Sequence, residues 1–324
     1  MGVKANIAEY LPEMAARQPE ATAILCPWGR RGGRLNYREL EERSTALANG
    51  LAAVGIGRGV RTVLMVPPGL DLFALAFALF KAGAVPVLVD PGIGLPHLKA
   101  CLANAAPEAF IGAPKAQAAR SLFGWARDSL RTWVTVGRRG WWGGLGLEEV
   151  ATRGRATTEC VPGSTGPDET AAIVFTSGST GPPKGVVYRH RNFSAQVEAI
   201  REAYAIEPGE VNLPTFPLFA LFDPALGMTT VVPDMDPTRP ARVDPRTIIG
   251  PVIEHGVSIM FGSPALLDTV GRWGVAHGVR LPGLRRVISA GAPVAPAILE
   301  RFQSLLGPGG ALHTPYGATE ALPV

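Results

Sequence analysis

The chain has 324 residues, 47% of them hydrophobic, so it can bury one large core or two ordinary ones and is too apolar for a disordered protein. Lys and Arg outnumber Asp and Glu by 31 to 27, a formal net charge of +4. The basic residues are scattered rather than gathered in a stripe with interleaved aromatic residues, which argues against nucleic-acid binding.

Three widely spaced cysteines, Cys26, Cys101 and Cys160, do not suit a disulfide framework and indicate a reducing compartment, the cytoplasm. The first ten residues contain Lys4 and Glu9 and no sustained apolar segment, so no secretory signal is expected. The most apolar stretch, residues 72–80, is too short to span a bilayer and predicts a buried helix rather than an integral membrane segment.

The first third of the chain predicts alternating helices and strands. Helices are expected at residues 7–17, from a cap at Asn36 to Gly55, at 70–82 and at 95–105, and strands at 21–25, 60–66, 85–89 and 109–111. Such alternation predicts an α/β fold of stacked parallel or mixed sheets with flanking helices.

Between residues 114 and 167 the periodicity is lost, and no element is predicted there. Trp141 and Trp142 have two readings in this segment. They form a binding surface, or they pack with the other tryptophans under a long surface segment, which is the commoner use of this side chain.

Residues 176–185, the signature loop, read Thr-Ser-Gly-Ser-Thr-Gly-Pro-Pro-Lys-Gly and follow an apolar run at 171–175 that predicts a buried strand. Three glycines let backbone N–H groups approach an anion, and four hydroxyls and the Lys184 ammonium add donors. The spacing is not that of a Walker P-loop. A Ser/Gly-rich turn without a ligand is the alternative, but it needs neither Lys184 nor the rigid Pro182-Pro183 pair.

The remainder of the chain continues the alternation. Strands are predicted at 186–188, 257–261, 286–289 and 311–314, and helices from caps at Asn192 and Ser263 and over 295–306. In open parallel sheets, ligands bind beyond the carboxyl ends of the strands. The signature loop, Ser-Ala-Gly-Ala-Pro at 289–293 and Tyr-Gly-Ala-Thr-Glu at 316–320 all occupy such ends.

A single acid, Asp223, is embedded in the apolar and aromatic segment 213–233. Because Pro224 follows it, the favoured reading is the N-cap of a helix, although a cap can also contact a ligand. Asp234 and Asp236 are interpreted as turn residues rather than metal ligands.

The signature loop and the two later stretches, in this order, resemble the adenylate-forming superfamily of acyl-CoA synthetases, luciferases and peptide-synthetase adenylation domains. The resemblance implies that residues 1–324 are an N-terminal AMP-binding domain that uses ATP and Mg²⁺ to form an acyl-adenylate. Family members continue past the point that matches Val324 with a small lid domain, so we expect a truncated chain that turns over poorly alone.

The resemblance also implies roles for individual residues. The phosphate-binding residues would be Thr176, Ser177, Gly178, Ser179, Thr180, Gly181 and Lys184. The adenine-binding residues would be Gly291, Ala292, Pro293, Tyr316 and Gly317. Lys184, Thr319 at the α-phosphate and Glu320 would be catalytic, and Glu320 with Thr180 would hold Mg²⁺.

Residues 216–240 and 314–323 resemble the olefin β-lactone synthetases of bacterial hydrocarbon biosynthesis. Many acyl-CoA synthetases have a histidine after Pro-Leu-Phe, whereas Ala220 follows Phe219 here. The resemblance implies a long-chain 2-alkyl-3-hydroxy acid substrate, whose hydroxyl displaces AMP to close a lactone, and partner enzymes of the hydrocarbon pathway. Its acyl pocket would contain Phe219, Ala220, Phe222 and Asp223. As a separate hypothesis, Asp223 hydrogen-bonds the 3-hydroxyl or helps to deprotonate it.

Two alternatives stay open at this point. One is a long-chain acyl-CoA ligase, which shares the phosphate chemistry and differs in requiring coenzyme A. The other is a non-catalytic nucleotide- or lipid-binding remnant, which the intact signature loop disfavours.

Overall fold

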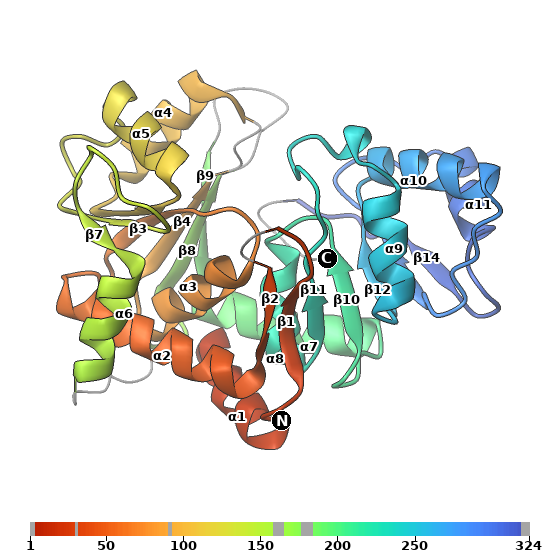
Figure 1. Ribbon diagram of the computed structural model, residues 1–324, viewed down its shortest axis with the longest axis horizontal. Helices are drawn as coiled ribbons and strands as arrows, with labels where there is room; N and C mark the ends of the chain where they lie inside the picture. Colours follow the sequence, from red (N-terminus) through yellow and green to blue (C-terminus); the bar gives the residue numbers. More distant parts are fainter. Residues whose placement is uncertain (1–3, 30–31, 90–92, 158–164, 176–183, 319–324) are drawn as a thin grey trace. The chain divides into compact units, whose positions relative to one another are not determined.

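The computed structural model describes residues 4–29, 32–89, 93–157, 165–175 and 184–318. These residues form two compact units, each built on its own sheet of seven strands. Unit 1 comprises Met1–Ala15 and Arg38–Ala195, and unit 2 comprises Ala16–Tyr37 and Gln196–Val324 (Figure 1). Among the described residues, no helix is both long and apolar enough to cross a membrane.

The sheet of unit 1 has the order β7-β6-β5-β3-β4-β8-β9 and is parallel except for β9 at its edge. Its strands are β3 (Arg61–Met65), β4 (Val85–Val89), β5 (Ala109–Gly112), β6 (Thr132–Thr135), β7 (Leu145–Gly146), β8 (Thr170–Phe175) and β9 (Gly185–Arg189). Its helices are α2 (Tyr37–Ala53), α3 (Leu70–Lys81), α4 (Leu95–Ala105), α5 (Pro114–Phe123) and α6 (Leu147–Ala156).

The sheet of unit 2 has the order β14-β13-β12-β10-β11-β1-β2 and is parallel except for β2 at its edge. Its strands are β1 (Thr22–Cys26), β2 (Gly33–Asn36), β10 (Val211–Pro214), β11 (Thr229–Val231), β12 (Ile259–Phe261), β13 (Arg286–Ile288) and β14 (Ala311–His313). Its helices include α8 (Asp223–Leu226), α9 (Arg246–Glu254), α10 (Pro264–Ala276) and α11 (Pro296–Gln303).

The helices α1 (Tyr10–Arg17) and α7 (His190–Ala203) each have residues in both units, and α2 has only its first residue, Tyr37, in unit 2. The predicted cap of α7 is wrong, because the helix begins at His190 and Asn192 lies within its first turn. Its Oδ1 accepts a hydrogen bond from the backbone N–H of Arg189, 2.8 Å away, so the side chain reaches back as in a capping box. The predicted cap of α10 is confirmed, since the Ser263 side chain accepts from the N–H of Leu266.

Apolar helix faces supply the core of each unit. In unit 2, α9, α10 and α11 bury residues such as Val252, Leu266 and Phe302 against the strands, and the helices gather beside β12 and β14 in Figure 1. In unit 1, α4 packs with β3, β4, β5 and the fully buried Phe110. This burial is the main source of stability in both units.

The segment without a predicted element, residues 114–167, contains α5, β6, β7 and α6. The packing interpretation of its tryptophans is confirmed for three of the four. Trp125 is buried, the indole of Trp133 donates to the Trp142 carbonyl at 3.1 Å, and the indole of Trp142 donates to Thr135 Oγ1 at 3.0 Å. Trp141 is exposed.

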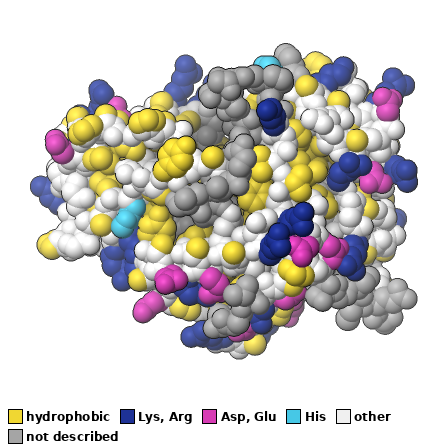
Figure 2. Space-filling model, turned by 180° about the vertical axis from the view of Figure 1, so that it is seen from behind, with side chains coloured by type: hydrophobic (Ala, Val, Ile, Leu, Met, Phe, Trp, Pro, Cys, Tyr) yellow, Lys and Arg dark blue, Asp and Glu magenta, His cyan; other side chains and the backbone are white. Residues whose placement is uncertain are grey.

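Charged side chains of both signs are interspersed over the face shown in Figure 2. Three ion pairs of this mixed kind are Arg272 with Asp268, Arg246 with Asp244, and Arg285 with Glu210. In these three pairs a basic side chain lies directly beside an acidic one.

Candidate active site

The strand ends of unit 2 bring two of the sequence motifs to one edge of the sheet. Ile288 of β13 is paired in parallel register with His313 of β14. Gly291 and Tyr316 each lie three residues beyond this pair, so the two motifs leave neighbouring strands at the same edge. The expectation that these motifs occupy carboxyl ends of parallel strands is confirmed.

The adenine-binding candidates are accessible at this edge. Gly291, Ala292, Pro293 and Gly317 are exposed, and the Tyr316 ring is 88% exposed, so its face is free to stack on a planar ligand. Gly291 has a φ of +92°, a conformation that a side chain disfavours, and it turns the chain immediately after the strand.

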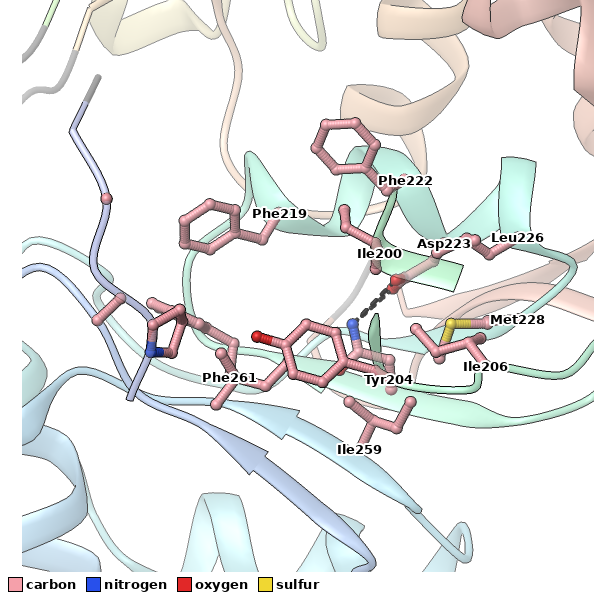
Figure 3. A pocket seen from close by; sticks show the side chains of 15 residues that line it. Ile200, Tyr204, Ile206, Phe219, Phe222, Asp223, Leu226, Met228, Ile259 and Phe261 are labelled. Carbon is pink, nitrogen blue, oxygen red and sulfur yellow. Dashed lines mark hydrogen bonds between the residues drawn. The ribbon is translucent and has the colours of Figure 1, made fainter. Parts of the chain in front are cut away.

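One pocket of unit 2 opens between these strand ends and the acyl-pocket candidates (Figure 3). Ala290 and Gly317 contribute to its wall together with Phe219, Phe222 and Asp223. The wall is otherwise mostly apolar, with Ile200, Ile206, Leu226, Met228, Ile259 and Phe261 among its members. Ala220, the fourth acyl-pocket candidate, is completely buried and does not belong to this wall.

The aromatic side chains of the wall hold each other in place. The Phe219 ring meets Phe261 edge to face with ring centroids 4.4 Å apart, and it also contacts Phe216. Tyr204 makes a second edge-to-face contact with His313 of β14. These contacts fix a mostly apolar cavity beside the strand ends, the kind of site that takes an apolar ligand.

Asp223 does not cap a helix, so the favoured sequence interpretation was wrong. It is the first residue of α8 and has helical backbone angles, and its side chain turns toward the sheet instead of the helix N-terminus. Oδ1 and Oδ2 lie 2.9 and 3.0 Å from Asn212 Nδ2, and Oδ2 accepts from Thr230 Oγ1 at 2.7 Å. Burial raises the pKa of Asp223 from 3.8 to about 7, although both donors act in the opposite direction.

Asn212 and Thr230 are the functional candidates that sequence reasoning missed. Asn212 is on β10 and Thr230 on β11, and neither strand was predicted. The single polar residue in the short run Val211–Pro214 was the available signal, because an amide inside a buried strand needs a partner.

Lys184 immediately precedes β9 and is exposed in unit 1. The strand before the signature loop is β8, as predicted, and β9 returns antiparallel to it. The phosphate-binding candidates Thr176, Ser177, Gly178, Ser179, Thr180 and Gly181 lie outside the described residues.

The metal candidates Glu320 and Thr180, like the catalytic candidate Thr319, also lie outside the described residues. Within the residues that the structure does describe, no group of three or more His, Cys, Asp or Glu side chains is placed to hold a metal ion.

Comparison with known proteins places the chain in a family. The AMP-binding enzyme family model matches residues 11–324. An olefin β-lactone synthetase from Xanthomonas campestris is 52% identical over 98% of this chain, and one from Stenotrophomonas maltophilia is 53% identical over the same share. The chain spans 58% of the length of each of these relatives.

A solved structure of a long-chain fatty-acid–CoA ligase from Archaeoglobus fulgidus superimposes with a TM-score of 0.86 and 21% identity. The match covers 99% of this chain and 66% of that one. At this identity the likeness concerns the fold, and it confirms the predicted α/β architecture of mixed sheets with flanking helices. On the strength of the family match and its three ordered motifs, this chain belongs to the AMP-binding enzyme family.

Proposed function

We propose that the protein activates a long-chain 2-alkyl-3-hydroxy acid with ATP and converts it to a β-lactone, releasing AMP and pyrophosphate. The observation that carries the proposal is the composition of the pocket in unit 2. One cavity is lined both by the strand-end residues Ala290 and Gly317 and by the apolar segment around Phe219 and Phe222. Adenylation requires this proximity, because the acyl carboxylate must meet the α-phosphate.

Each group of residues has a separate task. The signature loop with Lys184 would hold the β- and γ-phosphates, and Thr319 would contact the α-phosphate. Mg²⁺, held by Glu320 and Thr180, would neutralise phosphate charge. Tyr316 would stack on adenine, with Gly291 and Gly317 at the same strand ends, while the mostly apolar wall would exclude water from the acyl-adenylate. None of these tasks requires the thiol of coenzyme A as an acceptor. We also propose that the enzyme acts in the cytoplasm beside other enzymes of the hydrocarbon pathway.

The test uses the full-length native protein with ATP, Mg²⁺ and a long-chain 2-alkyl-3-hydroxy acid, without coenzyme A. We expect AMP release together with a product that has lost one water relative to the acid. AMP release that appears only with coenzyme A and gives a thioester would instead identify an acyl-CoA ligase. Absence of AMP under both conditions would favour the non-catalytic alternative.

Replacing Lys184 by alanine is expected to slow adenylation about a hundredfold, since removing one positioned donor to developing charge costs this much in other enzymes. The side chain is exposed, so the substitution should leave the fold intact. The measurement is ATP–pyrophosphate exchange driven by the acid. Lys115→Ala, which removes another exposed lysine of unit 1, is the matched control, and an equal loss in both variants would contradict the assignment.

Replacing Tyr316 by alanine is expected to raise the KM for ATP about tenfold, because stacking on a base contributes roughly 1–3 kcal/mol. The ring is 88% exposed, so little packing is lost. Tyr316→Phe keeps the ring and should retain a KM close to that of the native enzyme. An unchanged KM in the alanine variant would remove Tyr316 from the adenine site.

A further inference from the structure

The pocket of unit 2 contains a buried polar cluster that its apolar wall does not explain. Asp223 from α8 and Asn212 from β10 both line the cavity, and they are only 3% and 7% exposed. The Asn212 Nδ2 group donates a hydrogen bond to Asp223 Oδ1 at 2.9 Å, and Figure 3 shows Asp223 beside Leu226 and Met228. Thr230 on the adjacent β11 supports the carboxyl group without belonging to the pocket wall.

Burying this cluster costs folding free energy that a purely structural role does not explain. Asp223 caps no helix, and its described hydrogen-bond partners, Asn212 and Thr230, are neutral, so burying its charge is not offset by a cation. An aliphatic residue would fill the same position at lower cost. The carboxyl group therefore suggests a ligand that needs it.

Asn212 provides a second, independent observation. Its Nδ2 group donates to Asp223, but its Oδ1 has no hydrogen-bond partner, although the residue is more than nine-tenths buried. A buried acceptor without a donor costs about 1–3 kcal/mol. The two residues that line the cavity therefore carry more acceptors than donors: Asn212 Oδ1 has no donor, and the Asp223 carboxylate has lone pairs left after its bonds to Asn212 and Thr230.

We propose that Asp223 and Asn212 form the site that recognises the substrate's hydroxyl group, with Asp223 as the acceptor of its proton during ring closure. This inference rests on the proposed function and names the residues that select a hydroxy acid over a plain fatty acid. A hydroxyl is the smallest group that supplies the missing donor on an otherwise aliphatic chain.

The proposed step balances in atoms and charge. The hydroxyl oxygen forms a bond to the acyl carbon of the adenylate, and its proton passes to the Asp223 carboxylate. The bond between the acyl carbon and the phosphate oxygen breaks, and AMP leaves with the electron pair. Asn212, whose Nδ2 group donates to both carboxylate oxygens, holds the Asp223 carboxyl group in position as the proton is transferred, which is an orientation effect rather than a chemical one.

Direct binding separates this inference from the proposed function. Calorimetry on the full-length native protein compares a 2-alkyl-3-hydroxy acid, its 3-deoxy counterpart and its 3-amino counterpart. We expect the hydroxy acid to bind at least about a hundredfold more tightly than the deoxy acid, because a site built for a hydroxyl strongly rejects an analogue that lacks it. Asp223→Asn should reduce this preference at least tenfold and slow lactone formation about a hundredfold.

Thr230→Val is the matched control, because it removes a hydrogen bond to the same carboxyl group from outside the pocket wall. It should keep most of the hydroxyl preference, whereas a merely structural role of the cluster predicts equal losses in both variants. Unselective binding by the native protein, or an unaltered preference in Asp223→Asn, would overturn the inference. Tighter binding of the 3-amino counterpart than of the 3-hydroxy acid would also overturn the inference, because it would indicate a site for an ammonium group.

The same data distinguish the two levels of the proposal. Selective binding of the hydroxy acid that depends on Asp223, without any lactone, would refute the proposed function and leave the hydroxyl site standing. Lactone formation together with unselective binding would support the proposed function and refute the hydroxyl site.

Discussion

Gly154→Ala is expected to lower the free energy of unfolding of unit 1 by about 3 kcal/mol or more, the upper end of the cost of overpacking. Gly154 in α6 faces Gly50 in α2, and the two helix backbones are in direct contact there. A Cβ atom at Gly154 would overlap the carbonyl oxygen of Ala46 and lie 2.6 Å from the Gly50 nitrogen. Both obstacles are backbone atoms, so neither can move aside without displacing a helix.

The direction of the change in unfolding free energy distinguishes overlap between the helices from a local effect within α6. Alanine is favoured over glycine inside an isolated helix by about 1 kcal/mol, so a purely local effect would stabilise α6. Urea unfolding combined with hydrogen exchange of the α2 and α6 amides measures the outcome in the right unit. Gly57→Ala is the control, because a Cβ there meets no atom within 4 Å and the backbone does not have a positive φ. A stable Gly154→Ala variant would mean that the helices do not pack at this point.

Helix and strand periodicity was sufficient to predict most of the fold. The run 70–82 became α3 (Leu70–Lys81), and the apolar run before the signature loop became β8. Both have long apolar patterns and clear ends, which depend only on local sequence. The edge strands β2 and β9 run antiparallel to their neighbours β1 and β8, which makes both sheets mixed. This direction is set by the pairing with the neighbour, so it could not be read from the sequences of β2 and β9 themselves.

The parts that could not be predicted depend on distant contacts. Strand β11 has three residues and β10 has four, which is too few for an alternating hydrophobic pattern to be recognised. They are recognisable as strands only because they pair in parallel with each other in the sheet. The Asp-Pro pair at Asp223 satisfied the local rule for a helix cap, yet the side chain bonds across the sheet to Asn212 and Thr230. Local rules identify which residues are unusual, and only the fold shows what they contact.

Asp223→Asn is expected to raise the free energy of unfolding of unit 2 at pH 8 by on the order of 3–4 kcal/mol, because each pKa unit corresponds to 1.36 kcal/mol. The pKa of Asp223 rises from 3.8 to about 7 because the carboxyl is buried among apolar groups. The unfolded chain therefore loses this proton at a lower pH than the folded chain. Stability contributed by the protonated carboxyl is fully present below pH 3.8 and is lost as the pH rises through about 7.

The amide of the variant is neutral at every pH in this range, so it avoids this loss. The stability difference from the native protein should grow from pH 4 to 7 and then level off. Tyr37 and Tyr204, the titratable neighbours, do not disturb this window, because burial raises the pKa of both phenols.

Hydrogen exchange of the β10 and β11 amides across this pH range measures the difference where it arises. Asp234→Asn, at an exposed acid of the same unit, is the control and should change stability by less than about 0.5 kcal/mol. A variant that is more stable but has lost hydroxyl selectivity would show that the carboxyl is kept for binding at a cost to folding. A difference that does not vary with pH would mean that the carboxyl is well solvated, and the hydroxyl site would then lose its main physical support.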